Sequence, residues 1–166
     1  TTVTKLDEYI ISNNLLSDFS NFLNDVSEQH FDFSTDSSEK QLLCKINEKT
    51  VPFHLIASTG TRSLQLLYFW IKRMSKDASF VFIDEFDAFY HYKLSFKVCK
   101  QLFDLNCQVF MSSHNTYLMT NDLLRPDCNF ILNNGCIKAL SDCTEKELRF
   151  GHNIEKIYRA GAFYGE

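Results

Sequence analysis

Two adjacent carboxylates, Asp84 and Glu85, come directly after the mostly apolar run 79–83. Such a run is typical of a strand buried on both faces, as in a parallel sheet covered by helices. Two acids at its end would lie at the carboxyl edge of the sheet, where open α/β folds bind ligands. Because successive residues point in different directions, Asp84 could hold Mg²⁺ through water while Glu85 polarises the water that attacks a γ-phosphorus. The alternative is a surface Asp-Glu pair that begins a turn.

A histidine, His114, stands just past a second apolar run, residues 106–112. In a parallel sheet this strand would end on the same edge as Asp84. An imidazole at that edge can donate a hydrogen bond to a γ-phosphate oxygen and sense whether that phosphate is present. The alternative is a histidine that only caps or packs against a neighbouring element.

Small hydroxyl residues and a glycine form the segment Ser58-Thr59-Gly60-Thr61-Arg62, which precedes a run with helical spacing. A helix that begins here offers free N–H groups, hydroxyls and the positive end of its dipole, and together these suit an anion. The alternative is plain N-capping. The three segments in this order are more specific than any one of them.

The elements that must position these residues alternate along the chain. The pattern predicts a packing helix or helical hairpin up to about residue 28, a polar loop at 30–40, and a strand hairpin from 41–46 and 51–57. Helices are then expected after residue 61 and at 91–105, 117–124 and 144–160, and strands at 79–84 and 106–112. Two short strands, 129–132 and 136–140, are expected as a hairpin around Asn133-Asn134-Gly135. This order predicts an α/β fold with a mostly parallel sheet flanked by helices.

Composition narrows the class of protein. The 166 residues, 45% hydrophobic and 23% charged, are ordinary for one soluble globular domain, and no apolar run approaches the roughly 20 residues that span a bilayer. Six cysteines without a C-x-x-C pair argue against a zinc site and favour reduced thiols in a cytoplasmic protein. A net charge of −4 without a Lys/Arg block gives no electrostatic footprint for nucleic acid. The chain does not start with Met, so we expect a fragment or a processed product.

The three segments together resemble the second half of ABC-type ATPase domains. They are most similar to the AAA-like group that includes the overcoming-lysogenization-defect (OLD) ATPases and related bacterial defence ATPases. The resemblance covers about residues 53–165. It rests on a signature-like segment, a Walker B and D-loop segment, a switch-histidine segment and a tail, at residues 58–62, 83–91, 110–118 and 149–163.

The resemblance implies a P-loop NTPase fold in which residues 41–166 are the C-terminal lobe and residues 1–40 are a helical arm or packing helices plus a loop. It also implies ATP and Mg²⁺ as cofactors. If the family's residue roles apply to the matching positions of this chain, Asp84 supports Mg²⁺, Glu85 is the general base, and His114 contacts the γ-phosphate in the same subunit.

In this family two ATPase domains face head to tail, with each ATP held between one subunit's phosphate loop and the other's signature. The resemblance therefore implies a homodimer formed through a nucleotide sandwich. Ser58, Thr59 and Gly60 would reach the ATP of the partner subunit, and Asp87 would sit in the D-loop across the interface. A switch built in this way could gate a nuclease effector or act on DNA, for example in antiviral defence, with no membrane partner.

The chain departs from the family at the phosphate loop. The Walker A motif Gly-x-x-x-x-Gly-Lys-Ser/Thr is absent from all 166 residues, and Tyr92 and Thr116 stand where the group often has Pro. We therefore expect the Walker A lobe to lie outside this chain, and this chain alone to be inactive. One alternative is a degenerate ABC-like module for dimerisation or partner binding, without ATPase activity. Another is an unrelated α/β enzyme that uses Asp84 and Glu85 for metal chemistry.

Overall fold

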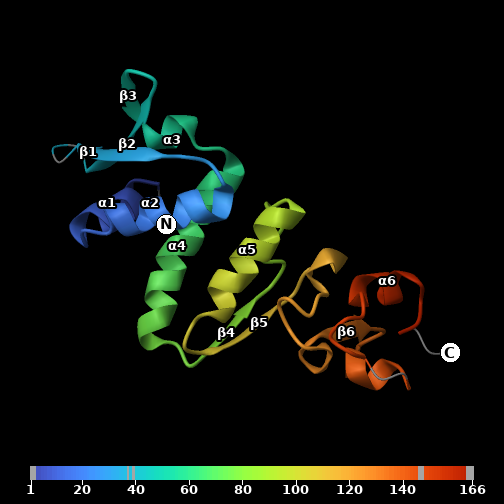
Figure 1. Cartoon of the computed structure of the whole chain (residues 1–166). Coiled ribbons are helices and arrows are strands. Elements are labelled where there is room, and N and C mark those ends of the chain that lie inside the picture. The colour runs from blue at the N-terminus through green and yellow to red at the C-terminus, as the bar shows by residue number, and fades with distance from the viewer. Residues whose placement is uncertain (1–2, 37, 39, 146–147, 164–166) are drawn as a thin grey trace. The chain divides into compact units, whose positions relative to one another are not determined.

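The computed structural model describes residues 3–36, 38, 40–145 and 148–163. The chain divides into two compact units, residues 1–111 and residues 112–166, whose elements are labelled in Figure 1. Each unit has its own apolar core. Helices and strands both contribute to the first unit, so the coarse prediction of a mixed α/β protein is confirmed.

The first unit contains five helices and five strands among its described residues. In chain order these are α1 (Val3–Ser12), α2 (Leu16–Ser27), β1 (Asp32–Asp36), β2 (Gln41–Ile46), β3 (Lys49–Pro52), α3 (Phe53–Ile56), α4 (Thr59–Asp77), β4 (Phe80–Ile83), α5 (Tyr92–Phe103) and β5 (Gln108–Met111). The predicted helices after residue 61 and at 91–105 are confirmed as α4 and α5. Their buried faces carry the expected apolar side chains, among them Leu64 and Val98.

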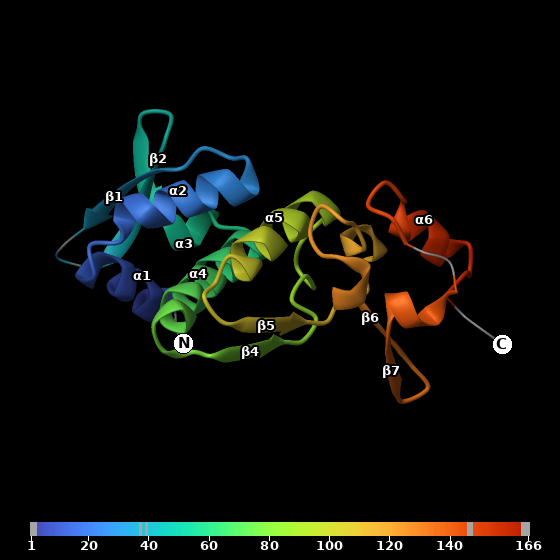
Figure 2. The same ribbon diagram turned by 60° about the horizontal axis from the view of Figure 1, so that its bottom comes forward.

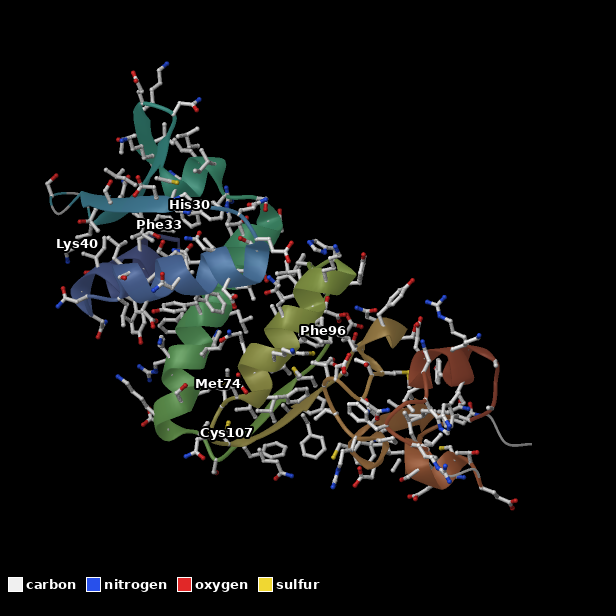
Figure 3. The ribbon with its side chains drawn as sticks, in the orientation of Figure 1. His30, Phe33, Lys40, Met74, Phe96 and Cys107 are labelled. Atoms are coloured by element: carbon white, nitrogen blue, oxygen red, sulfur yellow. The ribbon has the colours of Figure 1, made fainter. Side chains whose placement is uncertain are left out.

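The first sheet is antiparallel, with strand order β1-β2-β3. The prediction of a loop at residues 30–40 is wrong for β1, which pairs with β2 from Asp32 opposite Lys45 onward. Phe33 of β1 is half-buried, and its ring centroid lies 5.3 Å from that of Phe19 and 5.0 Å from that of Phe53 (Figure 3). Strand pairing and this aromatic contact outweigh the polar composition of the segment.

The core of the first unit is rich in aromatic side chains from helices α2, α3 and α4. Phe19, Phe53 and Tyr68 are each almost fully buried. The Tyr68 hydroxyl donates a hydrogen bond to the Asp18 carboxylate, and Lys72 Nζ lies 2.6 Å from the same carboxylate. These contacts join α2 to α4 and so support the helix that begins at the signature-like segment.

A buried carboxylate, Asp7, ties α1 to the rest of the first unit. It accepts hydrogen bonds from Gln65 Nε2 at 2.6 Å and from the Leu42 backbone N–H at 3.2 Å. Burial raises the pKa of this carboxyl, while the two hydrogen bonds act in the opposite direction. Residues of α1 therefore share polar contacts with both β2 and α4.

Strands β4 and β5 form a two-stranded parallel sheet with Phe80 opposite Gln108 and Ile83 opposite Met111. Helices α4 and α5 cover one face of it (Figure 2), and Ile83, Val109 and Met111 pack against the core. On the other face, Phe80 and Phe82 are more than half exposed. The sequence predicted a strand buried on both faces, but the described residues cover only one.

The sheets differ from the mostly parallel sheet that the sequence predicted. Among the described residues, β4–β5 is the one parallel pair, and the other two sheets are antiparallel. The hairpin expected from 41–46 and 51–57 forms as β2 and β3, but its second strand ends at Pro52 and residues 53–56 form α3. Among the described residues, neither this hairpin nor the strand pair at 130–139 joins β4 and β5 in one sheet. Antiparallel hairpins need only a short turn, whereas each parallel pair needs a crossover helix such as α5.

The second unit is built from short elements. These are η1 (Thr116–Leu118), η2 (Pro126–Cys128), β6 (Phe130–Asn133), β7 (Cys136–Ala139), η3 (Leu140–Cys143) and α6 (Ile154–Arg159), where η marks a 3₁₀ helix. The predicted hairpin is confirmed, since Asn134 and Gly135 both take positive φ at its turn, as a type I′ turn requires. The helices expected at 117–124 and 144–160 are wrong in length, because only η1 and α6 form among their described residues.

Candidate functional site

The two acids lie in a tight turn that follows β4. Residues 84–89 form this turn, and both Asp84 and Glu85 are exposed. Glu85 has a φ of 45°, in the left-handed region that residues other than glycine seldom occupy. A backbone hydrogen bond closes the turn, in which the Ala88 N–H donates to the Glu85 carbonyl at 3.0 Å. Residues held in sparsely populated backbone regions are common at functional sites.

The end of β5 lies beside the end of β4, because Ile83 is opposite Met111 in the parallel register. The chain therefore leaves both strands at the same edge of this sheet, as predicted. His114 follows three residues after Met111 and is exposed, but it belongs to the second unit. The structure places Asp84 and Glu85 together in the first unit, and His114 lies in the second.

The signature-like segment forms the N-terminus of α4, a helix of 19 residues. Ser58 is the N-cap: its Oγ accepts from the Thr61 N–H at 3.1 Å and lies 2.8 Å from Thr61 Oγ1. Ser58 and Thr59 are exposed, so this helix end faces solvent. The alternative interpretation as an N-cap is thus correct for the Ser58 oxygen. Capping still leaves the helix dipole and the first N–H groups available to an anion.

The signature-like segment lies against the turn that carries the acids. A Cβ built on Gly60 would stand 3.3 Å from the Phe89 carbonyl oxygen, a contact tight enough to favour glycine. Next to this contact, Ser63 Oγ and the Tyr90 hydroxyl are 2.9 Å apart and share a hydrogen bond. The sequence analysis missed Ser63 and Tyr90. The glycine at the second position of a helix was the available signal, because it often marks a close approach of backbone.

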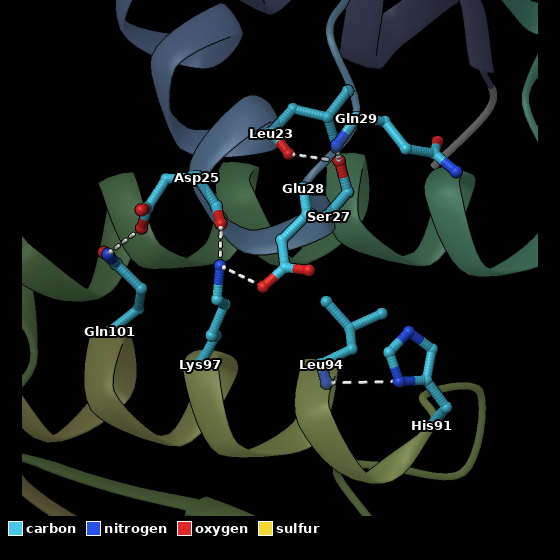
Figure 4. Close-up of polar contacts among 9 residues, drawn as sticks. All are labelled: Leu23, Asp25, Ser27, Glu28, Gln29, His91, Leu94, Lys97 and Gln101. Carbon is cyan, nitrogen blue, oxygen red and sulfur yellow. Dashed lines mark hydrogen bonds and ion pairs between the residues drawn. The ribbon is translucent and has the colours of Figure 1, made fainter.

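Helix α5 begins where this turn ends, and α2 holds it in place (Figure 4). His91 caps α5, since its Nδ1 accepts from the Leu94 N–H at 3.5 Å. Lys97 Nζ donates to the Asp25 carbonyl oxygen at 2.7 Å and lies 3.1 Å from Glu28 Oε1. The hydrogen bond from Lys97, together with its charge, lowers the pKa of Glu28. The first turns of α5 therefore have fixed partners on a different helix.

Asp87, the predicted D-loop acid, lies in the same turn and is half-buried. Its carbonyl accepts a hydrogen bond from the Tyr90 N–H at 2.9 Å. Burial, and to a lesser degree the Asp87 carboxylate, raise the pKa of the Cys99 thiol to about 12. The carboxylate therefore lies close to α5 of its own chain. Cys99 stays a neutral core thiol at physiological pH, as the sequence predicted for cysteines in helical runs.

In the second unit, the residues after His114 pack against the tail. Asn115 Oδ1 accepts from the Tyr117 N–H at 3.2 Å and so caps η1. The Arg159 guanidinium of α6 lies 5.2 Å from the centroid of the Tyr117 ring and pairs with Glu155 Oε1 at 2.7 Å. The tail, which contributed to the resemblance, thus supports the segment just beyond His114.

No group of three or more His, Cys, Asp or Glu side chains in the described part of the chain is placed to hold a metal ion. Mg²⁺ in nucleotide sites is bound by one or two carboxylates together with substrate phosphates and water, so a single acid is enough. Asp84 fits that role, because it is an exposed carboxylate at the carboxyl end of a parallel strand.

The comparison with known families assigns this chain to the AAA domains. The chain belongs to the family described as "AAA domain, putative AbiEii toxin, Type IV TA system", whose model matches residues 5–120. The matched range includes Ser58, Asp84, Glu85 and His114.

The fold is also similar to that of a solved structure described as "Structural biochemistry of ATP-driven dimerization and DNA stimulated activation of SMC ATPases". The TM-score is 0.52 and the sequence identity 12%, over 96% of this chain and 98% of that chain. At this identity the likeness shows a shared fold, the α/β fold of SMC ATPases. No curated protein matches the chain. No helix among the described residues is long and apolar enough to cross a membrane.

Proposed function

We propose that this chain is the C-terminal lobe of an ATP-hydrolysing domain that dimerises around ATP. Residues 41–166 would form the lobe, and residues 1–40 would pack on it as a helical arm. The observation that carries the proposal is the turn after β4, in which Asp84 and the left-handed Glu85 lie at the carboxyl end of a parallel strand. Membership in an ATPase family gives this arrangement its most direct interpretation.

Within one subunit, three side chains would act on the nucleotide. Asp84 would hold Mg²⁺, which when bound neutralises charge on the phosphates. Glu85 would accept a proton from the attacking water, and its exposed position in the turn after β4 supports this. His114 would donate a hydrogen bond to the γ-phosphate and so distinguish ATP from ADP.

Across the dimer, the exposed N-terminus of α4 would meet the ATP of the partner subunit. The N–H groups at Thr59 and Gly60, the Ser58 hydroxyl and the helix dipole together suit a γ-phosphate. Asp87 would lie in the D-loop beside this contact. Because one helix end would be delivered by each subunit, dimerisation would depend on the γ-phosphate, and hydrolysis would open the dimer.

The role of the ATPase is proposed from its relatives. The SMC-like structure comes from work on ATP-driven dimerization and DNA-stimulated activation, and the family description refers to a toxin of a type IV toxin–antitoxin system. We therefore propose that ATP-dependent dimerisation gates an effector such as a nuclease, or acts on DNA, in antiviral defence. The lobe that carries the phosphate loop would come from outside residues 1–166.

The experiment that tests this proposal replaces Glu85 with Gln in the full-length protein. Loss of a general base typically slows the chemical step by about 10²–10⁴-fold, so ATP hydrolysis should fall by that factor while ATP binding persists. A matched control is Glu145→Gln, which removes an exposed acid of the second unit and should leave turnover unchanged. Equal turnover of the Glu85→Gln and native proteins would remove Glu85 from the mechanism.

A second candidate function has one observation in its favour, the absence of a phosphate loop from all 166 residues. In this candidate the chain is a degenerate module that binds a partner or dimerises without hydrolysing ATP. The two candidates differ in nucleotide binding by the full-length protein. Saturable ATP binding that requires Mg²⁺ supports the ATPase, and its absence supports the degenerate module.

A further inference from the structure

The hydroxyl of Tyr90 lies between the two segments that the proposed function brings to the nucleotide. Tyr90 follows the turn 84–89, and its hydroxyl is 2.9 Å from Ser63 Oγ in the first turns of α4. Its ring is half-buried and packs against the core. Burial raises the pKa of Tyr90, so the hydroxyl keeps its proton at physiological pH. The contact is therefore a neutral hydrogen bond shielded in part from water.

The backbone around Tyr90 is held from three directions. The Tyr90 N–H donates to the Asp87 carbonyl at 2.9 Å, within the turn. The buried Ser95 hydroxyl of α5 lies 3.1 Å from the His91 carbonyl and 3.5 Å from the Tyr90 carbonyl. On the α4 side, the Phe89 carbonyl oxygen lies so close to Gly60 that a side chain at position 60 would require one of the two segments to shift.

These contacts place the hydrogen bond close to both functional segments. Ser63 is five residues from Ser58, which is about 7 Å along a helix axis. Asp87 lies three residues before Tyr90 in a closed turn. The hydrogen bond of Tyr90 is therefore made to the same end of α4 that carries Ser58.

We propose that Tyr90 is a positioning residue that joins the turn after β4 to the N-terminus of α4, so that the two segments engage a partner's nucleotide as one body. This inference rests on the proposed function for its consequence, but the coupling itself is a property of this chain. Without the hydrogen bond, the helix end and the turn could move separately. The alignment needed for hydrolysis would then form less often.

The coupling is tested first without nucleotide, by hydrogen exchange of the backbone amides. Tyr90→Phe removes only the hydroxyl and keeps the ring in the core, and Ser63→Ala removes the other half of the bond. We expect each variant to lower the protection of the hydrogen-bonded amides in both segments, 61–63 and 88–90, by about threefold to tenfold, as for the loss of one hydrogen bond. Ser75→Ala is the matched control, because its hydroxyl bonds to the Ile71 carbonyl within α4. Unchanged protection in 61–63 for Tyr90→Phe would overturn the proposal.

The second readout is ATP hydrolysis by the full-length protein. Tyr90→Phe should lower kcat by about threefold to tenfold with KM for ATP unchanged, since the hydroxyl affects alignment and not the first binding of ATP. In the Ser63→Ala background the same change should have no further effect, and Ser63→Thr, which keeps a hydroxyl, should restore kcat. Effects of Tyr90→Phe and Ser63→Ala that multiply would overturn the coupling. Absence of hydrolysis in the native protein would instead refute the proposed function, and the exchange experiment would still decide the coupling.

Discussion

The N-cap of α4 allows a sharp test of whether this helix end binds an anion or only caps itself. Ser58 is exposed and its Oγ accepts the Thr61 N–H. Asp and Asn are as good as Ser at an N-cap, so Ser58→Asp and Ser58→Asn should both keep the helix start intact. They differ in one unit of negative charge. Any difference between the two variants in nucleotide-dependent behaviour therefore reports the charge at this position.

The expected magnitudes follow from these properties. The free energy of unfolding of Ser58→Asn should stay within about 0.5 kcal/mol of the native value, and that of Ser58→Asp should be higher by about 0.3–1 kcal/mol because of the helix dipole. A carboxylate about 4 Å from a bound phosphate costs about 4 kcal/mol at an effective dielectric constant of 20. This corresponds to about 10³-fold weaker ATP-dependent dimerisation for Ser58→Asp. Ser58→Asn, which lacks the charge, should lose much less.

The assay has two parts. Urea denaturation of this chain measures the free energy of unfolding, and sedimentation of the full-length protein with ATP measures dimerisation. If both variants dimerise as well as the native protein, the N-terminus of α4 does not meet a phosphate. If both fail equally, the loss is not electrostatic and the reasoning from charge is refuted.

Two further predictions concern Gly60 and Asp18. Gly60→Ala should change the free energy of unfolding by less than about 1 kcal/mol, because the gain in helix propensity offsets the contact with the Phe89 carbonyl. The same variant should lower ATP hydrolysis by the full-length protein. Unchanged hydrolysis would contradict this prediction. Burial alone would raise the pKa of Asp18, but hydrogen bonds from Lys72 and Tyr68 outweigh burial and lower this pKa in the folded protein. The ionised Asp18 carboxylate therefore stabilises the fold at pH values above its pKa in the unfolded chain. This stabilisation is lost as the pH falls through the pKa of Asp18 in the folded protein. Asp18→Asn should therefore cost about 1 kcal/mol at pH 7, discounted for an exposed carboxylate, and less at pH 2 than at pH 7, as urea denaturation at the two pH values would show.

Local signals made part of this fold predictable. The apolar spacing after residue 61 and in 91–105 predicted α4 and α5, and Asn134-Gly135 predicted the hairpin turn. The order of strands and helices along the chain also predicted that β4 and β5 end at the same edge of a sheet. These features depend on neighbours within a few residues or on the rule that parallel strands share an orientation.

Features that depend on distant contacts were not predictable in the same way. β1 has a polar composition and forms because Asp32–Asp36 meets β2. The bond between Ser63 and Tyr90 joins residues 27 apart, and nothing in either neighbourhood points to the other. Phe80 and Phe82 were predicted to be buried because they are apolar, whereas no described residues cover the face of the β4–β5 sheet on which they lie. Where His114 lies relative to Asp84 depends on two units and was beyond any local pattern.

The central claim is that each nucleotide site takes its acids from one subunit and its α4 N-terminus from the other. The measurement that tests it most directly mixes two full-length variants, Ser58→Asp and Glu85→Gln, each of which should hydrolyse almost no ATP alone. In a heterodimer of the two, one site would combine the intact Glu85 of one subunit with the intact Ser58 of the other. At protein concentrations that keep all of the subunits dimeric, the two variants pair at random and the mixture should recover about a quarter of native hydrolysis, since half of the dimers carry one intact site of two. If the mixture stays as inactive as its components, the two residues serve the same subunit's site and the shared site is wrong.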